Sequence, residues 1–294
     1  ASGIYNLISY TGTKYGTGVI DAAAGTVPSG YTVEVKNSTG LIYLESSYNG
    51  GPLNYWNPLA STNANNMGGN GTWSTTSQTW SDAAASVTQA MYPQPGFAIF
   101  KDNQGAVTVS GSGVAATGMQ FLVNYTLMGD TLTLASNGSG QQSAIRTGDG
   151  TASVTPHVAI NNVIAGTNGL DKQDAGTLYL TANNTFSGGV SVTGGVLSVG
   201  QDSNLGAASN AVALKGGTLE VTGGFASARN VAVTGTTSAI RTAGAGATLT
   251  LNGNVTGAGA LTKDGAGTLV LNGNNTYSGA TTVAAGTLRA GSST

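Results

Sequence analysis

The sequence contains a single histidine, His157, and its isolation limits the chemistry that it could perform. A serine hydrolase triad needs a histidine as general base, so His157 would have to fill that role. It lies in a Thr-Pro-His-Val-Ala-Ile segment at the start of an expected strand, and no G-x-S-x-G nucleophile motif occurs anywhere. One histidine without cysteine does not provide a zinc site. We therefore predict no catalytic and no metal-binding residues, and interpret His157 as structural.

The acidic residues could act as a pair on a polysaccharide, because glycoside hydrolysis uses two carboxyl groups about 5–10 Å apart. The twelve acids are scattered, and only Asp171 and Asp174 lie close in a shared turn, beside Lys172. The corresponding turn 91 residues later keeps the lysine, as Lys263, but shifts the acid. This pattern predicts a solvated turn. The Gly-Asp-Gly segment at 148–150 is similar to a calcium-binding nonapeptide but has no tandem copy, so no cofactor is expected.

Aromatic residues gather in one segment and are the best hint of a binding site. All three tryptophans, Trp56, Trp73 and Trp80, lie between residues 49 and 96 with Tyr55. Exposed aromatic rings can stack on sugars or anchor a protein partner. Alternatively, the rings cap a break in the fold and bury open strand edges. These four residues are the candidate ligand contacts, and both interpretations stay open.

The composition excludes several classes of protein. Charged residues make up 7% of the chain, against about 25% in typical soluble domains, while 39% of residues are hydrophobic. The ten basic residues are scattered, which disfavours a nucleic-acid partner. No apolar run of about 18 residues predicts a transmembrane helix. The opening residues do not form a signal peptide, so we interpret the chain as a processed or excised piece. These features predict a folded protein with a surface of Thr, Ser, Asn and Gly.

Internal repetition is the strongest signal in the sequence. The segments 170–200 and 261–291 align without a gap at an offset of 91 residues and are identical at 16 of 31 positions. The segment Ser-Ala-Ile-Arg-Thr occurs at 143–147 and again at 238–242, an offset of 95, which predicts four extra residues in a loop of the first copy. Residues 97–294 therefore contain two units of about 91 residues, and repeats of this kind indicate a stacked architecture.

Short strands with alternating apolar and polar residues fill each unit, and Gly or Asn separates most of them. We predict an all-β fold, a right-handed parallel β-helix with about 20–25 residues per turn. A β-sandwich would have longer strands. Asparagines at 183–184 and 274–275 occupy matching corners, where stacked side chains can bond along the axis. Residues 1–48 are interpreted as the end of a preceding β-helix unit, and 49–96 as an aromatic, Gly/Asn-rich break or excursion.

The segment GAGTLVLNGNNTYSGATTVAAGTLRAG at 265–291, with its sibling at 175–200, resembles the passenger-associated repeat of bacterial autotransporters, the type V secretion proteins. The segments YWN and GGNGTWSTTSQTWSD are similar to segments of large adhesin-like members. The resemblance implies a parallel β-helix exported across the outer membrane and displayed on the cell surface. It also implies a role in adhesion or self-association.

The function expected from this resemblance is a non-enzymatic extracellular stalk. Its partners would be a host or cell-surface ligand, protein or glycan, or further copies of the chain in a homo-oligomer or filament. A neutral surface of Thr, Ser and Asn can contact the same surface of another copy with little electrostatic repulsion. Two alternatives stay open: a building block of a surface filament or layer without a specific ligand, and a β-helical enzyme acting on polysaccharide.

Overall fold

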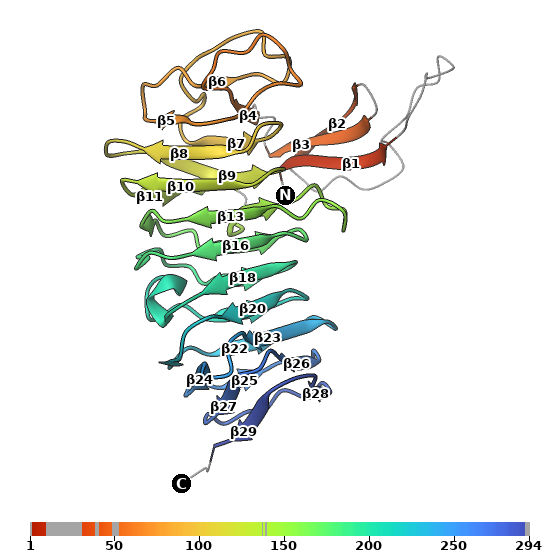
Figure 1. Ribbon diagram of the computed structural model, residues 1–294, viewed down its shortest axis with the longest axis vertical. Coiled ribbons are helices and arrows are strands. Elements are labelled where there is room, and N and C mark those ends of the chain that lie inside the picture. Colours follow the sequence, from red (N-terminus) through yellow and green to blue (C-terminus); the bar gives the residue numbers. More distant parts are fainter. Residues whose placement is uncertain are drawn as a thin grey trace.

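The computed structural model describes residues 2–9, 31–38, 41–48, 53–136, 138 and 140–291, and only the backbone of 6–9, 31–38 and 41–48. These residues form a solenoid of about nine turns of parallel strands, with one 3-10 helix, η1 (Asp202–Leu205). No helix among them is long and apolar enough to cross a membrane. The strands stack along one long axis (Figure 1). The predicted all-β fold, a parallel β-helix, is confirmed.

The ten-stranded sheet, sheet I, faces the viewer in Figure 1 and is parallel throughout. Its strands in stacking order are β5 (Gly71–Trp73), β8 (Gly105–Val109), β10 (Tyr125–Gly129), β13 (His157–Ile160), β16 (Thr177–Leu180), β18 (Val196–Val199), β20 (Thr218–Val221), β23 (Ser238–Thr242), β26 (Leu261–Asp264) and β28 (Thr281–Val283).

Two further sheets complete the turns. The main path of sheet II runs through β6 (Trp80–Ser81), β4 (Leu53–Trp56), β7 (Gly96–Phe100), β9 (Ala115–Phe121), β12 (Ser143–Thr147), β15 (Leu170–Gln173), β17 (Val190–Val192), β19 (Val212–Leu214), β22 (Val231–Val233) and β25 (Val255–Thr256), with β11 (Leu132–Leu134) and β14 (Ile164–Ala165) beside it. Sheet III contains β21 (Phe225–Ser227), β24 (Thr248–Leu251), β27 (Thr268–Leu271) and β29 (Thr287–Ala290).

Columns of identical or similar apolar side chains fill the interior. In sheet I, Leu178 pairs with Leu197, Leu197 with Leu219, and Leu219 with Ile240. All four side chains are buried. The sequence separations of these pairs show that one turn takes 19 to 22 residues, close to the length expected from the sequence. Because successive side chains of a strand point to opposite faces, the apolar columns lie inside and the polar residues next to them in the sequence lie outside.

Asparagines at the corners bond along the solenoid axis, as predicted, although their partners are mainly backbone groups. The Oδ1 atom of Asn184 accepts the N–H of Ile164 at 2.8 Å, and its Nδ2 donates to the carbonyl of Asn204 at 2.7 Å. The matching Asn275 accepts the N–H of Val255 at 2.8 Å. Each of these corner amides therefore satisfies at least one polar backbone group of an adjacent turn that no strand ladder reaches.

The two copies of the repeat lie on different faces of the solenoid. In the first copy, β15 and β17 belong to sheet II and β16 and β18 to sheet I. In the second, β26 and β28 belong to sheet I and β27 and β29 to sheet III. After β15 the chain passes through sheet II four more times, at β17, β19, β22 and β25, and so completes four turns. The next strand, β26, which is equivalent to β15, then lies on the following face, sheet I. Equivalent surfaces of the two copies consequently point in different directions.

The four-residue difference between the copies lies in a loop, as predicted. The Ser-Ala-Ile-Arg-Thr segments form β12 and β23. Residues 148–156 connect β12 to β13, whereas residues 243–247 connect β23 to β24. The first connection is four residues longer, and His157 and Thr248 begin the two equivalent strands that follow.

The predicted domain boundaries stay predictions, but the segments they enclose are arranged in a way that the sequence did not indicate. Within 1–48, β1 (Gly3–Ser9), β2 (Tyr31–Ser38) and β3 (Leu41–Tyr48) pair antiparallel, instead of forming parallel turns. This small sheet projects from the side of the β-helix (Figure 1). Within 49–96, β4 and β5 pair with β7 and β8, so part of that segment belongs to the solenoid.

Replacement of Asn184 by alanine tests the corner bonds. Asn184→Ala should lower the free energy of unfolding by about 1–3 kcal/mol, because a buried N–H and a carbonyl lose their partners. Asn183→Ala is the matched control, since Asn183 is exposed and its side chain accepts only from Gln201 and Ser203. Urea denaturation of the three proteins measures the difference. Equal midpoints for both variants would contradict a role for the buried amide.

Candidate functional site

The three tryptophans close one end of the hydrophobic core. Trp56, Trp73 and Trp80 are each 0% exposed. The ring of Trp80 lies 5.1 Å from that of Trp56 and 4.9 Å from that of Trp73, both edge-on. Phe100 lies below them, 5.7 Å from Trp80, and stacks on Phe121 at 4.6 Å. The aromatic cluster thus continues the interior columns and covers their end.

Tyr55 is also buried, at 2% exposure, in a second cluster on the outer face of sheet II that includes Ile4, Phe97 and Ile99. Direct contact of Tyr55 and the tryptophans with a ligand stays a prediction. Their burial nevertheless removes the exposed rings on which that prediction depended. The alternative interpretation, in which the aromatic residues cap the solenoid, agrees with their positions.

His157 lies on the exposed face of sheet I, and its partners are those of a surface side chain. Its Nδ1 atom is 3.0 Å from the hydroxyl of Tyr179, and the two rings are nearly parallel. Its backbone N–H donates to Asn124. In the described part of the chain, no group of three or more His, Cys, Asp or Glu side chains could hold a metal ion.

The turn predicted to be solvated is instead built around a buried ammonium group. Lys172 is 0% exposed, and its Nζ donates to the carbonyls of Gln173 at 2.8 Å, Asp174 at 2.8 Å and Gly194 at 3.0 Å. The carbonyls of Gln173 and Asp174 belong to its own turn, whereas Gly194 belongs to the next. The expectation of a solvated turn was wrong because three backbone acceptors compensate for burying the cation.

The second copy of the repeat builds the same arrangement. Lys263 is 0% exposed and donates to the carbonyls of Asp264 at 2.7 Å, Gly265 at 2.8 Å and Ala285 at 3.1 Å. This lysine is the only charged residue that is identical in the two copies of the repeat. That identity was the signal that could have indicated a structural role, since a solvated lysine has no reason to keep its position.

An arginine of the preceding strand holds the acid of each turn. Arg146 of β12 is buried and pairs with Asp174 at 2.9 Å. Arg241 of β23 pairs with Asp264 at 2.9 Å and with Glu220 at 3.4 Å. The hydrogen bond between Arg241 and Asp264 lowers the pKa of Asp264 and raises the pKa of Arg241. The acid moves by one position between the copies, yet the ion pair to the Ser-Ala-Ile-Arg-Thr strand is retained.

The start of β1 docks on the outer face of sheet II. The backbone N–H of Ile4 donates to Oε1 of Gln120 at 2.6 Å, and Nε2 of Gln120 donates to the carbonyl of Ile4 at 2.7 Å. The guanidinium of Arg146 lies over the ring of Tyr5, 3.7 Å from its centroid. These contacts fix the N-terminal strand beside the exposed surface of sheet II.

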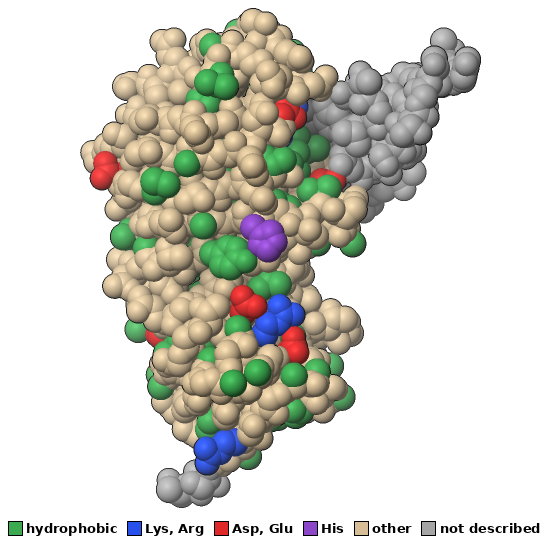
Figure 2. Space-filling view, viewed as in Figure 1, with side chains coloured by type: hydrophobic (Ala, Val, Ile, Leu, Met, Phe, Trp, Pro, Cys, Tyr) green, Lys and Arg blue, Asp and Glu red, His purple; other side chains and the backbone are tan. Residues whose placement is uncertain are grey.

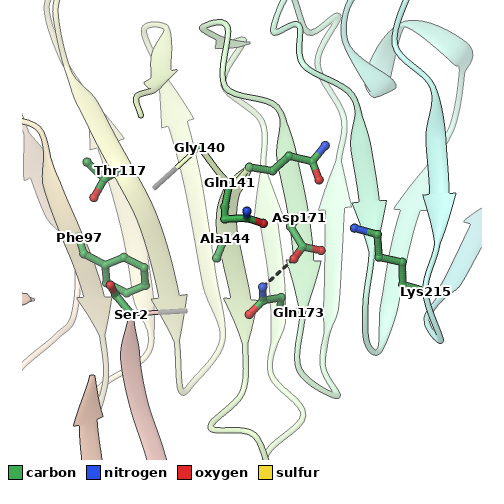
Figure 3. A pocket seen from close by; sticks show the side chains of 10 residues that line it. Ser2, Phe97, Thr117, Gly140, Gln141, Ala144, Asp171, Gln173 and Lys215 are labelled. Carbon is green, nitrogen blue, oxygen red and sulfur yellow. Dashed lines mark hydrogen bonds between the residues drawn. The ribbon is translucent and has the colours of Figure 1, made fainter. Parts of the chain in front are cut away.

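A pocket of about 250 Å³ lies next to this docked strand (Figure 3). Its lining includes Phe97, Gln141, Asp171, Gln173 and Lys215, which come from three different turns and from one loop. A second, more open pocket of about 430 Å³ lies on sheet I. Its lining includes His157 and the amide side chains of Asn70, Gln104 and Asn124. Neither pocket was predictable from the sequence, because residues 20 or more positions apart meet only after the turns stack.

Comparison with known proteins agrees with this architecture. Residues 170–199 and 261–290 match the family model of the Passenger-associated-transport-repeat. The chain is also 39% identical, over 297 aligned residues and 99% of its length, to the protein named Adhesin BmaC autotransporter of Brucella suis biovar 1 (strain 1330). The chain therefore contains two copies of the repeat of autotransporter passengers and is similar to part of an autotransporter adhesin. It spans 8% of the length of that relative, and no solved structure matches it.

The family resemblance expected from the sequence is therefore confirmed, and the passenger chain is exported and surface-exposed. Each segment that matches the family model contains two consecutive turns: β15 to β18 in the first copy and β26 to β29 in the second. The buried lysine joins these two turns. The charged residue near the start of the passenger repeat thus links two turns of the solenoid.

Truncation of the central tryptophan tests the aromatic cap. Trp80→Ala should lower the free energy of unfolding by about 3–5 kcal/mol, because it leaves a cavity among three packed rings. Leu59→Ala, in the same segment but at a side chain that is 70% exposed, should change it little. Guanidinium denaturation followed by tryptophan fluorescence and by circular dichroism measures both. Similar stabilities for the two variants would argue against the cap.

The buried lysine should make passenger stability depend on pH. Burial lowers the pKa of Lys172 to about 7, against the opposing attraction of Asp174 and Asp171. In the unfolded chain the pKa is about 10.4, so between pH 7 and 10 the unfolded state binds more protons. The free energy of unfolding should therefore rise with pH across this window.

Comparison with Lys172→Met isolates the contribution of that group. The variant should lack the part of the rise that Lys172 contributes, whereas Lys215→Met, at an exposed lysine, should keep it. Urea midpoints of the three proteins at pH 7 and pH 10 provide the measurement. Parallel pH dependence in all three would show that Lys172 keeps its proton in the fold.

Proposed function

We propose that this passenger segment is a non-enzymatic extracellular stalk that mediates adhesion or self-association after export across the outer membrane. The observation that carries the proposal is its 39% identity, over 99% of the chain, to a protein named as an adhesin. Because the chain corresponds to 8% of that relative, its contribution to attachment has to be tested on the segment itself.

The exposed face of sheet I supports the self-association part of the proposal. One outward column consists of uncharged side chains on five successive strands, Thr177, Val196, Thr218, Ala239 and Thr262. The adjacent column includes Arg241, whose charge is balanced by ion pairs along the same column. Figure 2 shows a face with few charged side chains: one small group of both signs lies below the histidine, and the others are scattered. Another copy can approach such a face with little charge repulsion.

The ion pair and hydrogen bonds made by Asp174 and Asp171 support the non-enzymatic part of the proposal. Asp174 is paired with Arg146, and Asp171 accepts hydrogen bonds from Gln173 and Thr193 at 2.6 Å. The two acids that the sequence placed together therefore have structural partners in the fold.

Sedimentation velocity and electron microscopy over a concentration series test self-association. The wild-type segment should form dimers or filaments as its concentration rises. The double variant Thr218→Lys and Thr262→Lys should suppress them, because it places like charges on sheet I. Thr250→Lys, on sheet III, is the control and should associate normally. A wild-type segment that stays monomeric throughout would contradict self-association.

Attachment of beads coated with the segment to host cells tests adhesion separately. Coated beads should bind cells in proportion to the coating density, and beads coated with an unrelated β-helical protein should not. Attachment without self-association would leave the adhesin role standing alone. Self-association without attachment would favour the filament or layer alternative.

A further inference from the structure

The floor of the pocket on sheet II includes Ala144 and Asp171, which belong to an outward column of side chains that crosses several turns. Ala144 pairs with Asp171, Asp171 with Ser191, and Ser191 with Ala213, so their side chains form one outward column. Gly118, next to Ala144 in this column, leaves room for the Phe97 ring, since a Cβ at Gly118 would come within 2.7 Å of that ring. Phe97 lines one end of the pocket and Lys215 the other (Figure 3).

Fixed acceptors occupy the middle of this floor. The carboxylate of Asp171 receives hydrogen bonds from Nε2 of Gln173 and from the hydroxyl of Thr193, both at 2.6 Å. A carboxylate has about four acceptor positions, so it retains capacity for further donors. Gln142 is fixed in the same way, because its Nε2 donates to the carbonyl of Gly188 at 2.9 Å, which leaves its Oε1 as an acceptor. These groups suit a ligand with several hydroxyl donors.

Lys215 supplies a cation at the end of the acceptors. Its side chain is exposed and extends along the floor toward Asp171 (Figure 3). In the part of the chain that the structure describes, Asp and Glu side chains form five ion pairs, and none of them involves Lys215. An anionic group of a ligand can therefore pair with this ammonium without displacing an internal partner.

The nature of the face disfavours a peptide as the occupant. A peptide that binds by strand addition needs an open sheet edge with unpaired backbone groups. At this pocket the strands β12, β15, β17 and β19 are paired on both sides by neighbouring turns. Recognition here must use side chains alone, through hydroxyl donors, one anionic group and an apolar edge against Phe97.

We propose that the pocket on the outer face of sheet II binds an acidic glycan, whose carboxylate pairs with Lys215 and whose hydroxyl groups bond to Asp171 and Gln142. The inference rests on the proposed adhesive function and names a ligand class for it. A sugar carrying a carboxylate combines the required hydroxyl donors, the negative charge and the apolar C–H surface in one molecule.

Titration calorimetry of the whole segment with three soluble sugars tests the proposal. Sialyllactose and a hyaluronan tetrasaccharide carry carboxylates from two different sources, and lactose is the neutral counterpart of the first. At least one acidic sugar should bind, and lactose should bind at least about tenfold more weakly, because it lacks the charged contact. The acidic sugar that binds identifies whether a sialic or a uronic acid is preferred.

Substitutions at the cation locate the binding site. Lys215→Gln should weaken binding of the acidic sugar about tenfold or more, while Lys215→Arg should retain most of it. Arg289→Gln, at an exposed cation on β29, is the matched control and should bind like the wild type. Lys215 is exposed, so its variants should fold normally, and their thermal midpoints verify this.

Three results would overturn the proposal: no binding of either acidic sugar, equal binding of lactose, or unchanged binding by Lys215→Gln. The bead assay distinguishes such a failure from failure of the adhesive function. Segment-coated beads that attach to cells when no sugar binds would keep the adhesin and remove the glycan site. Sugar binding that depends on Lys215, without attachment of the beads to cells, would keep the glycan site and remove the adhesive function.

Discussion

The need to satisfy backbone carbonyls at the corners of the solenoid is the constraint on which the rest of the structure depends. Within each face, parallel ladders pair the backbone groups, but the turns between faces leave carbonyls that point away from any strand. Lys172 and Lys263 each bind three of them. Arg229 binds the carbonyls of Asp202, Gly206 and Asn210, and its guanidinium pairs with the Asp202 carboxylate. Together with Arg146, these three cations are buried although basic residues are rare in the composition, so fewer charges remain on the outer faces.

This use of cations also explains which features of the passenger repeat recur. The residues identical in the two copies include the lysine, inward leucines such as Leu178 and Leu269, and corner glycines. These groups make contacts within two adjacent turns. Outward positions differ, as at Asp171 and Thr262. Since the second copy lies on another face, its outward residues meet different surroundings, whereas its internal contacts stay the same. Local contacts alone can therefore preserve the repeat.

The parts of the fold that were predictable from sequence are those set by neighbouring residues. Strand alternation, turn length, corner asparagines and the four-residue loop difference all follow from local pattern. The burial of Lys172 did not, because a lysine between two aspartates in a turn also fits a solvated surface. The tryptophans were ambiguous, since composition alone does not separate a cap from an exposed platform. The antiparallel pairing of β1 to β3 was missed because those strands have the same alternation as the parallel ones.

Specific binding in such a solenoid depends on the turns that break its regularity. Leu127 pairs with Ile160, so this turn takes 33 residues, against 19 to 23 further along sheet I. The additional residues form a loop before β12, which contributes Gln141 and Gln142 to the pocket, and another after it. In that second loop, the carbonyl of Gly148 accepts a hydrogen bond from Nε2 of Gln120. The same side-chain amide also donates to the carbonyl of Ile4 and so holds β1 in place. This long turn therefore helps to hold the N-terminal strand and forms one wall of the pocket. Uniform turns supply length and a neutral surface, and an irregular turn supplies the shape that a ligand can recognise.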